Sequence, residues 1–115
     1  MPLKIYKNEK RVWLNKYKRR HRDNGPAVEY PDGSKFWYKN GTRHKEDGPA
    51  IILSNGDKYW MVHGRLDRED GPAIEYGDGT KEYWIWGIRY DTEEEYNKEI
   101  NDLKQIRYKP NLHFS

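Results

Sequence analysis

The feature that most constrains the fold of this chain is an internal repeat of 23 residues. Three Gly-Pro-Ala segments recur at this spacing, at residues 25–27, 48–50 and 71–73. Turn glycines and an aromatic position keep the same spacing: Gly33, Gly56 and Gly79, and Trp37, Trp60 and Tyr83. A fixed period of this length is typical of architectures in which each repeat stacks on its neighbours. Three complete units therefore occupy residues 21–90, and a degraded half-unit with edge strands precedes them in residues 1–20.

Each unit has the pattern of a β-hairpin followed by a connecting segment. In the first unit Gly25-Pro26 breaks the preceding structure, and residues 27–30 and 35–38 alternate as strands do. Asp32-Gly33 lies between them and is a preferred pair for a two-residue hairpin turn, which needs positive φ. Asn40-Gly41 then turns the chain toward the next unit.

A two-residue turn at Asp32-Gly33 decides which side chains share a face. It places Val28 opposite Trp37 and Glu29 opposite Phe36, and opposed residues lie on one face of the sheet. The predicted core face is apolar in all three units, with Val28, Ile51 and Ile74, Tyr30, Leu53 and Tyr76, and Trp37, Trp60 and Tyr83. The other face is mixed, with Phe36, Tyr59 and Glu82, Tyr38, Met61 and Trp84, and Glu29, Ile52 and Glu75. We expect function on the mixed face.

The period changes after the third unit. Thr92 and Glu95 are spaced as a capping box at the start of a helix. An apolar stripe at helical spacing follows, formed by Tyr96, Ile100, Leu103 and Ile106. The sequence therefore predicts a capping helix over residues 91–108 and a tail over 109–115. The whole chain, 1–115, is predicted to be one mainly β domain: an elongated, twisted antiparallel sheet of repeated hairpins with a C-terminal α-helix.

Composition places limits on the class of protein. None of the 115 residues is a cysteine, which excludes disulfides and thiolate metal sites and fits a reducing cytoplasm. No apolar run approaches the ~18 residues of a membrane span, and the first residues lack the apolar run of a secretory signal. The 10 Tyr and 5 Trp argue against disorder, because disordered chains are poor in aromatic residues. We expect a folded cytoplasmic protein.

The repeat units resemble a known family. Residues 44–50 and 68–73, with Trp60 or Trp84 and a following glycine, are similar to MORN-type repeats. The similarity is to the variant form H-R-x-D-G-P-A … D-G … W-Y-x-N-G of bacterial, bacteriophage and giant-virus proteins. Three positions depart from this pattern, namely Asn24, Asp67 and Tyr83. The resemblance implies an elongated interaction scaffold and does not imply catalysis. Analogy with small phage proteins implies an inhibitor of a host defence system, such as an anti-CRISPR, in the host-cell cytoplasm.

The residues themselves do not indicate an enzyme. His21 and His44 precede Gly-Pro at equivalent positions, and His63 precedes a turn glycine, so the repeat explains their spacing without a metal. Asp23, Asp47 and Asp70 also recur near Gly-Pro, and we expect them to accept backbone amides in turns. Because an active site is unique whereas these positions are periodic, we predict no catalytic residue, no metal and no cofactor.

The distribution of charge suggests one kind of partner. Residues 1–22 hold nine Lys and Arg against one Glu, a net charge of +8, whereas residues 23–115 carry −5. A basic, aromatic segment of this kind can contact nucleic acid through Lys16, Lys18, Arg19, Arg20 and Arg22. The alternative explanation is an exposed edge strand kept soluble by its charges.

A protein partner is favoured over nucleic acid. Tyr, Trp and Arg are enriched at interface hot spots. The candidate contact residues are Phe36, Tyr38, Tyr59, Met61, Trp84 and Trp86, with Glu93 and Glu94 in an acidic cluster that can face a basic surface. The sequence predicts a non-enzymatic scaffold that binds a protein, with a nucleic-acid-binding module or an antitoxin-type protein as alternatives. Pairing of two copies through edge strands stays open.

Overall fold

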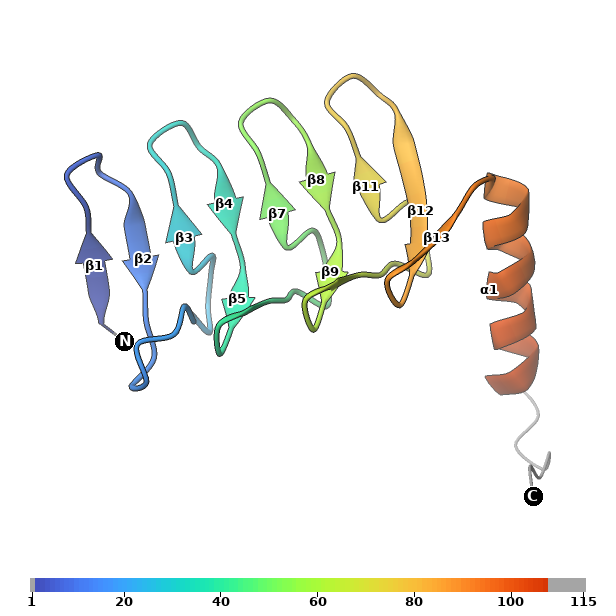
Figure 1. Ribbon diagram of the computed structural model, residues 1–115, viewed down its shortest axis with the longest axis horizontal. Helices are drawn as coiled ribbons and strands as arrows, with labels where there is room; N and C mark the ends of the chain where they lie inside the picture. The colour runs from blue at the N-terminus through green and yellow to red at the C-terminus, as the bar shows by residue number, and fades with distance from the viewer. Residues whose placement is uncertain (1, 108–115) are drawn as a thin grey trace.

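The computed structural model describes residues 2–107 and shows a mainly β molecule measuring 54 × 37 × 18 Å. Successive hairpins stand side by side along its long axis, and one helix closes the C-terminal end (Figure 1). This confirms the predicted architecture. Residue 108, predicted as the end of the helix, and the predicted tail at 109–115 lie outside the described residues.

One nine-stranded antiparallel sheet forms the body of the molecule. Its strands, in spatial order, are β1 (Leu3–Ile5), β2 (Arg11–Trp13), β3 (Val28–Glu29), β4 (Lys35–Phe36), β7 (Ile51–Ile52), β8 (Lys58–Tyr59), β11 (Ile74–Glu75), β12 (Lys81–Ile85) and β13 (Ile88–Tyr90). Two short hairpins extend the second strands of the first two units: β5 (Tyr38–Lys39) with β6 (Thr42–Arg43), and β9 (Met61–Val62) with β10 (Arg65–Leu66). The helix α1 spans Glu93–Arg107.

Two-residue hairpin turns occur at the second turn of each unit. Asn40 and Gly41 have φ values of 50° and 85°, and Lys39 pairs with Thr42 across them. Positive φ at both central residues defines a type I′ turn, whose twist matches that of the flanking strands. His63-Gly64 and Trp86-Gly87 have the same geometry, so a non-glycine residue adopts positive φ at each of these turns.

The first turn of each unit is longer than predicted. The Tyr30 amide donates to Ser34 O at 2.9 Å and the Gly33 amide donates to Tyr30 O at 3.0 Å, so three residues connect the strands. Only Gly33 of the Asp-Gly pair has positive φ, at 95°. This is a type I turn followed by one left-handed residue. The predicted two-residue turn is therefore wrong, and Val28 pairs with Phe36 rather than with Trp37.

This change of register exchanges the predicted faces. Phe36 pairs with Val28 and Ile51, and Tyr59 pairs with Ile51 and Ile74, so these residues share one face, which we call the apolar face. Successive residues of a strand point to opposite faces. The aromatic series Trp37, Trp60 and Tyr83, predicted for the core face beside Val28, Ile51 and Ile74, consequently lies on the opposite side, which we call the tryptophan face. The buried aliphatic part of the prediction is confirmed, because Val28, Ile51 and Ile74 are 1%, 6% and 4% exposed.

Connecting segments cover the tryptophan face. Each supplies one cation that lies over an indole ring of the preceding strand: Arg22 over Trp13 at 3.8 Å, Lys45 over Trp37 at 4.1 Å and Arg68 over Trp60 at 3.9 Å. Cations are attracted to the negative face of an aromatic ring. These cation–π contacts thus hold each connecting segment against the preceding strand on the tryptophan face.

Helix α1 takes the place of a further connecting segment on the last unit. The Glu95 amide donates to Thr92 Oγ1 at 3.1 Å, which confirms the predicted N-cap. Tyr96 lies against Tyr83, with ring centroids 4.8 Å apart. Ile100 completes a second core, but Ile106 at the end of the predicted stripe is 52% exposed.

Among residues 2–107, no helix has the length and apolar character needed to cross a membrane.

Candidate protein-binding groove

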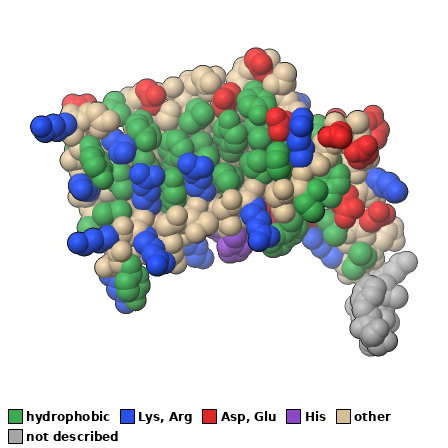
Figure 2. All heavy atoms as spheres, viewed as in Figure 1, with side chains coloured by type: hydrophobic (Ala, Val, Ile, Leu, Met, Phe, Trp, Pro, Cys, Tyr) green, Lys and Arg blue, Asp and Glu red, His purple; other side chains and the backbone are tan. Residues whose placement is uncertain are grey.

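An apolar groove lies on the apolar face, in the middle of the sheet. Its apolar lining comes from three consecutive strands of the sheet and the β9–β10 hairpin: Phe36, Ile51, Leu53, Tyr59, Met61 and Leu66. The groove has a volume of 460 Å³, and Arg43 lies at its edge. Figure 2 shows a band of hydrophobic side chains across successive hairpins, with Lys and Arg side chains between and beside them.

Strand pairing holds the floor of the groove in place. Ile51 on β7 pairs with Phe36 on one side and Tyr59 on the other. Tyr59 also contacts Tyr76 edge to face, with centroids 6.4 Å apart. Burial, and then the nearby charges of Asp57 and Glu82, raise the pKa of Tyr59, so its hydroxyl stays protonated and can donate. The groove is a preformed surface with a neutral phenol at its centre.

Arg43 at the edge of the groove is held in place by the buried side chain of Tyr38. Arg43 Nε donates to Tyr38 Oη at 3.3 Å, and Arg20 Nη1 donates to the same oxygen at 3.2 Å. Burial alone would raise the pKa of Tyr38, but the hydrogen bonds and charges of the two arginines lower it overall. Arg43 also lies 5.8 Å from the centre of the Phe36 ring. The edge therefore presents an arginine whose position is set by the core.

The structure brings together only some of the predicted contact residues. Phe36, Tyr59 and Met61 line the groove. The others lie outside the groove. Tyr38 is 8% exposed beneath Arg20 and Arg43, and Trp86 is 52% exposed in a turn. Trp84 donates to Glu82, Glu93 accepts from Tyr83, and Glu94 is exposed on the helix.

Sequence reasoning missed four residues of the groove, namely Arg43 at its edge and three apolar residues. Ile51 and Leu53 were expected on the opposite, core face, and they moved to the groove with the corrected register. Leu66 occupies the repeat position that holds Arg43 and Arg89 in the neighbouring units. This break in the repeat is the sequence signal that could have located an apolar site.

The basic segment near the N-terminus is divided by the fold. Asn15 and Arg19 are joined by a three-residue turn, which displays Lys16, Tyr17 and Lys18, and Tyr17 is 67% exposed. The side chains of Arg20 and Arg22 are engaged instead with Tyr38 and with Trp13. Of the five predicted nucleic-acid contacts, Lys16, Lys18 and Arg19 are thus exposed.

The histidines support turns. His21 Nδ1 accepts from the Asn40 amide at 2.9 Å, and His44 Nδ1 accepts from the His63 amide at 3.0 Å. In the third unit Asp67 accepts from the Trp86 amide at 3.0 Å. The rings of His21 and His44 thus each accept an amide proton from the first central residue of a two-residue turn. Asp67 stands at the repeat position of His21 and His44 and has the same acceptor function.

Carboxylates near Gly-Pro do not make the predicted turns. Asp23 contacts His21 Nε2 at 2.8 Å, and Asp70 accepts from Arg68 Nε at 3.0 Å. Amide-accepting side chains are found in the hairpin turns instead, as in Asp32, which accepts from the Ser34 amide at 2.8 Å. Within the described part of the chain, no three His, Asp or Glu side chains are placed to hold a metal ion.

Comparison of the chain with protein-family models, with curated proteins and with solved structures found no match. The function must therefore be argued from the residues and geometry of this chain.

Proposed function

We propose that this protein is a non-enzymatic scaffold that binds a partner protein through the groove of the apolar face. The observation that carries the proposal is the set of six apolar side chains gathered there from consecutive strands. Exposed apolar patches bordered by polar groups mark interaction sites in folded proteins. Phe36 and Tyr59 supply aromatic contact area of the kind that dominates binding energy at interfaces.

The chemistry of the groove defines the partner surface. Apolar side chains fill the groove, and a carboxylate on the partner pairs with Arg43 at its edge. The partner is thus an apolar surface with at least one acidic residue beside it. Recognition of a host defence enzyme through such a surface would make the protein an inhibitor, as the analogy with small phage proteins implies.

Site-specific photo-crosslinking tests the groove. A photoreactive phenylalanine analogue replaces Tyr59 in the groove, and in a matched control it replaces Lys58, whose side chain projects from the other face. We expect a discrete crosslinked adduct in cell extract from position 59 and none from position 58. The same adducts from both positions, or none from either, would count against binding through the groove.

Nucleic-acid binding is a second candidate because Lys16, Lys18 and Arg19 are exposed beside Tyr17. Each phosphate contact makes the logarithm of affinity fall with the logarithm of salt concentration, with a slope of about −0.7 per contact for single strands. Fluorescence anisotropy with a labelled single strand should show this dependence, and Arg19→Ala should weaken binding. Lys104→Ala on the helix is the matched control. An affinity that does not change with salt eliminates this candidate.

A further inference from the structure

Helix α1 shows how the last repeat holds a side chain. Tyr96 Oη donates to the carbonyl of Arg68 at 2.7 Å and accepts from the amide of Gly71 at 3.1 Å. The phenol ring lies against Tyr83 on the tryptophan face, with centroids 4.8 Å apart. A hydroxyl that both donates and accepts fits this pair of backbone groups, which we call the notch.

Each of the first two units has an equivalent notch. The backbone groups are the Arg22 carbonyl with the Gly25 amide, and the Lys45 carbonyl with the Gly48 amide. Neither glycine amide has a hydrogen-bond partner among residues 2–107, although both glycines are half-buried. Unpaired and partly buried amides of this kind gain free energy when they bind an acceptor. Two of the three notches are therefore open.

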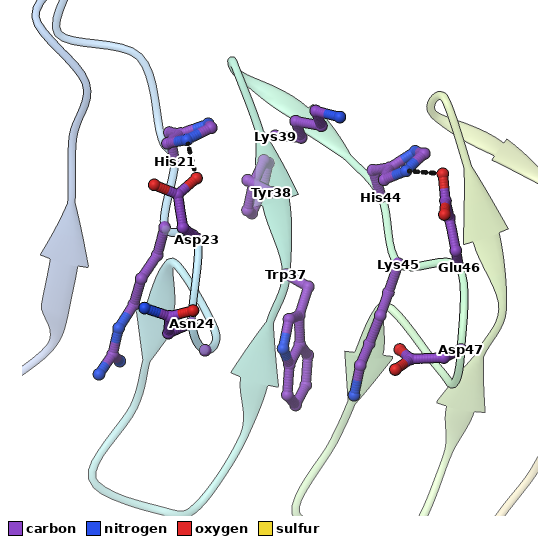
Figure 3. A pocket seen from close by; sticks show the side chains of 12 residues that line it. His21, Asp23, Asn24, Trp37, Tyr38, Lys39, His44, Lys45, Glu46 and Asp47 are labelled. Atoms are coloured by element: carbon purple, nitrogen blue, oxygen red, sulfur yellow. Dashed lines mark hydrogen bonds and ion pairs between the residues drawn. The ribbon is translucent and has the colours of Figure 1, made fainter.

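A groove leads to each open notch. The first lies between residues 21–25 and 44–47 and has a volume of 580 Å³, with Trp37 in its lining. Figure 3 shows Trp37 between Asn24 on one connecting segment and Lys45 on the next. The second groove, also 580 Å³, lies between residues 45–49 and 67–70 and includes Trp60. The corresponding groove of the third unit is bordered by Tyr96 of α1.

The rim of each open groove carries exposed carboxylates beside its lysine and arginine side chains. In the third unit Glu69 accepts two hydrogen bonds from Arg107 of α1, at 2.5 and 3.0 Å. The Arg107 hydrogen bonds and charge lower the pKa of Glu69. The equivalent rim positions of the first two units are Asp23 and Glu46, which are both exposed carboxylates. A segment that binds here is expected to carry a cation, as α1 does.

We propose that the two open grooves of the tryptophan face are binding sites for tyrosine side chains of a partner protein, on a segment that also carries Arg or Lys. The tyrosine hydroxyl bridges the notch while its ring enters the groove, and the cation pairs with Asp23 or Glu46. These sites lie on the opposite side of the sheet from the apolar groove and do not depend on it.

Titration followed by amide NMR tests this proposal with the full-length, ¹⁵N-labelled protein. The probe is a synthetic peptide with the sequence of residues 92–107, which carries both Tyr96 and Arg107. We expect the amide signals of Gly25 and Gly48 to shift with added peptide, while those of Gly33 and Gly56 in the hairpin turns stay in place. A peptide with Tyr96→Phe should bind about tenfold more weakly, because it cannot bridge the notch.

Protein variants complete the test. Glu46→Gln should weaken binding of the peptide at the second groove, whereas Glu94→Gln on the helix should not. Met61→Glu should leave the titration unchanged, which separates this proposal from the apolar groove. Three results would overturn it: unshifted Gly25 and Gly48 at millimolar peptide, equal binding of the Phe peptide, or a shift of Gly71 alone, which would mean that the peptide replaces α1.

Discussion

Removal of the Arg68 side chain tests which contacts hold a connecting segment against the tryptophan face. The guanidinium lies over Trp60 at 3.9 Å and donates to Pro72 O and Glu75 at 3.0 Å each. Its side chain is only 20% exposed. Lys45, the equivalent residue of the preceding unit, covers Trp37 at 4.1 Å. Comparison of variants at Arg68 and Lys45 therefore separates the stability due to the ring contact from that due to the additional hydrogen bonds.

The magnitude follows from these contacts. The cation–π contact is worth about 1 kcal/mol at a partly exposed site. The hydrogen bond from a charged donor to the Pro72 carbonyl adds about 1.5 kcal/mol. The half-exposed ion pair with Glu75 adds about 0.5 kcal/mol. We expect Arg68→Ala to lower the free energy of unfolding by about 3 kcal/mol and Lys45→Ala by about 1 kcal/mol.

Urea unfolding followed by circular dichroism measures both losses. The denaturation midpoint of Arg68→Ala should fall well below that of Lys45→Ala, with an unchanged slope. Lys98→Ala, an exposed residue of the helix, is the control and should match the wild type. If Arg68→Ala is no less stable than Lys45→Ala, the hydrogen bonds of Arg68 to Pro72 and Glu75 do not add the stability assigned to them.

Three further predictions concern the turns and the partly buried carboxylate of Glu82. Glu82 accepts from Tyr76 Oη at 2.8 Å and from Trp84 Nε1 at 3.0 Å, and these bonds lower its pKa below 4.5. The stability that Glu82 confers is therefore present above about pH 4.5 and is lost as the pH falls through the pKa of Glu82 in the folded protein. Between about pH 5 and pH 3, the urea midpoint of Glu82→Gln should therefore decline less than that of the wild type. Gly33 has a φ of 95° with nothing within 4 Å of an added Cβ, so backbone strain alone should lower the free energy of unfolding of Gly33→Ala by about 1–2 kcal/mol in the same assay. Gly48→Ala should lower it by about 0.5 kcal/mol or less. His44→Ala should lower the melting temperature because the His63 amide loses its acceptor. His44→Asp should restore most of the loss, because Asp67 accepts from the equivalent Trp86 amide in the third unit. Equal losses in both variants would contradict this function of His44.

The hairpin units and the capping helix could be predicted because their signals are local. Gly-Pro breaks, alternating strands and the Thr92 cap each act within a few residues, and each is found in the structure. The register could not be predicted in the same way. Asp-Gly suits both a two-residue and a three-residue turn, and here the two-residue turns fall at Asn40-Gly41 and its equivalents.

The shift of one residue in register moved the side chains of the second strand of each hairpin to the other face relative to those of the first strand. Phe36, Tyr59 and Met61 share a face with Ile51 and Leu53, whereas the predicted register placed them with Glu29, Ile52 and Glu75. The fold divides the basic segment in a way that its own sequence does not indicate. Tertiary contacts with Tyr38 and Trp13 engage two of its five predicted cations, and no sequence pattern within that segment indicates such distant partners.

The most direct test of binding through the apolar face compares two adjacent residues of β9. Met61 lines the apolar groove and Val62 lines a groove on the tryptophan face. Isothermal titration calorimetry is carried out with the purified protein captured by crosslinking at position 59. We expect Met61→Glu to weaken binding at least about tenfold, which corresponds to about 1.4 kcal/mol, and Val62→Glu to leave the affinity unchanged. Equal affinities of the wild type and Met61→Glu, with both variants folded, would contradict the assignment of this face as the binding surface.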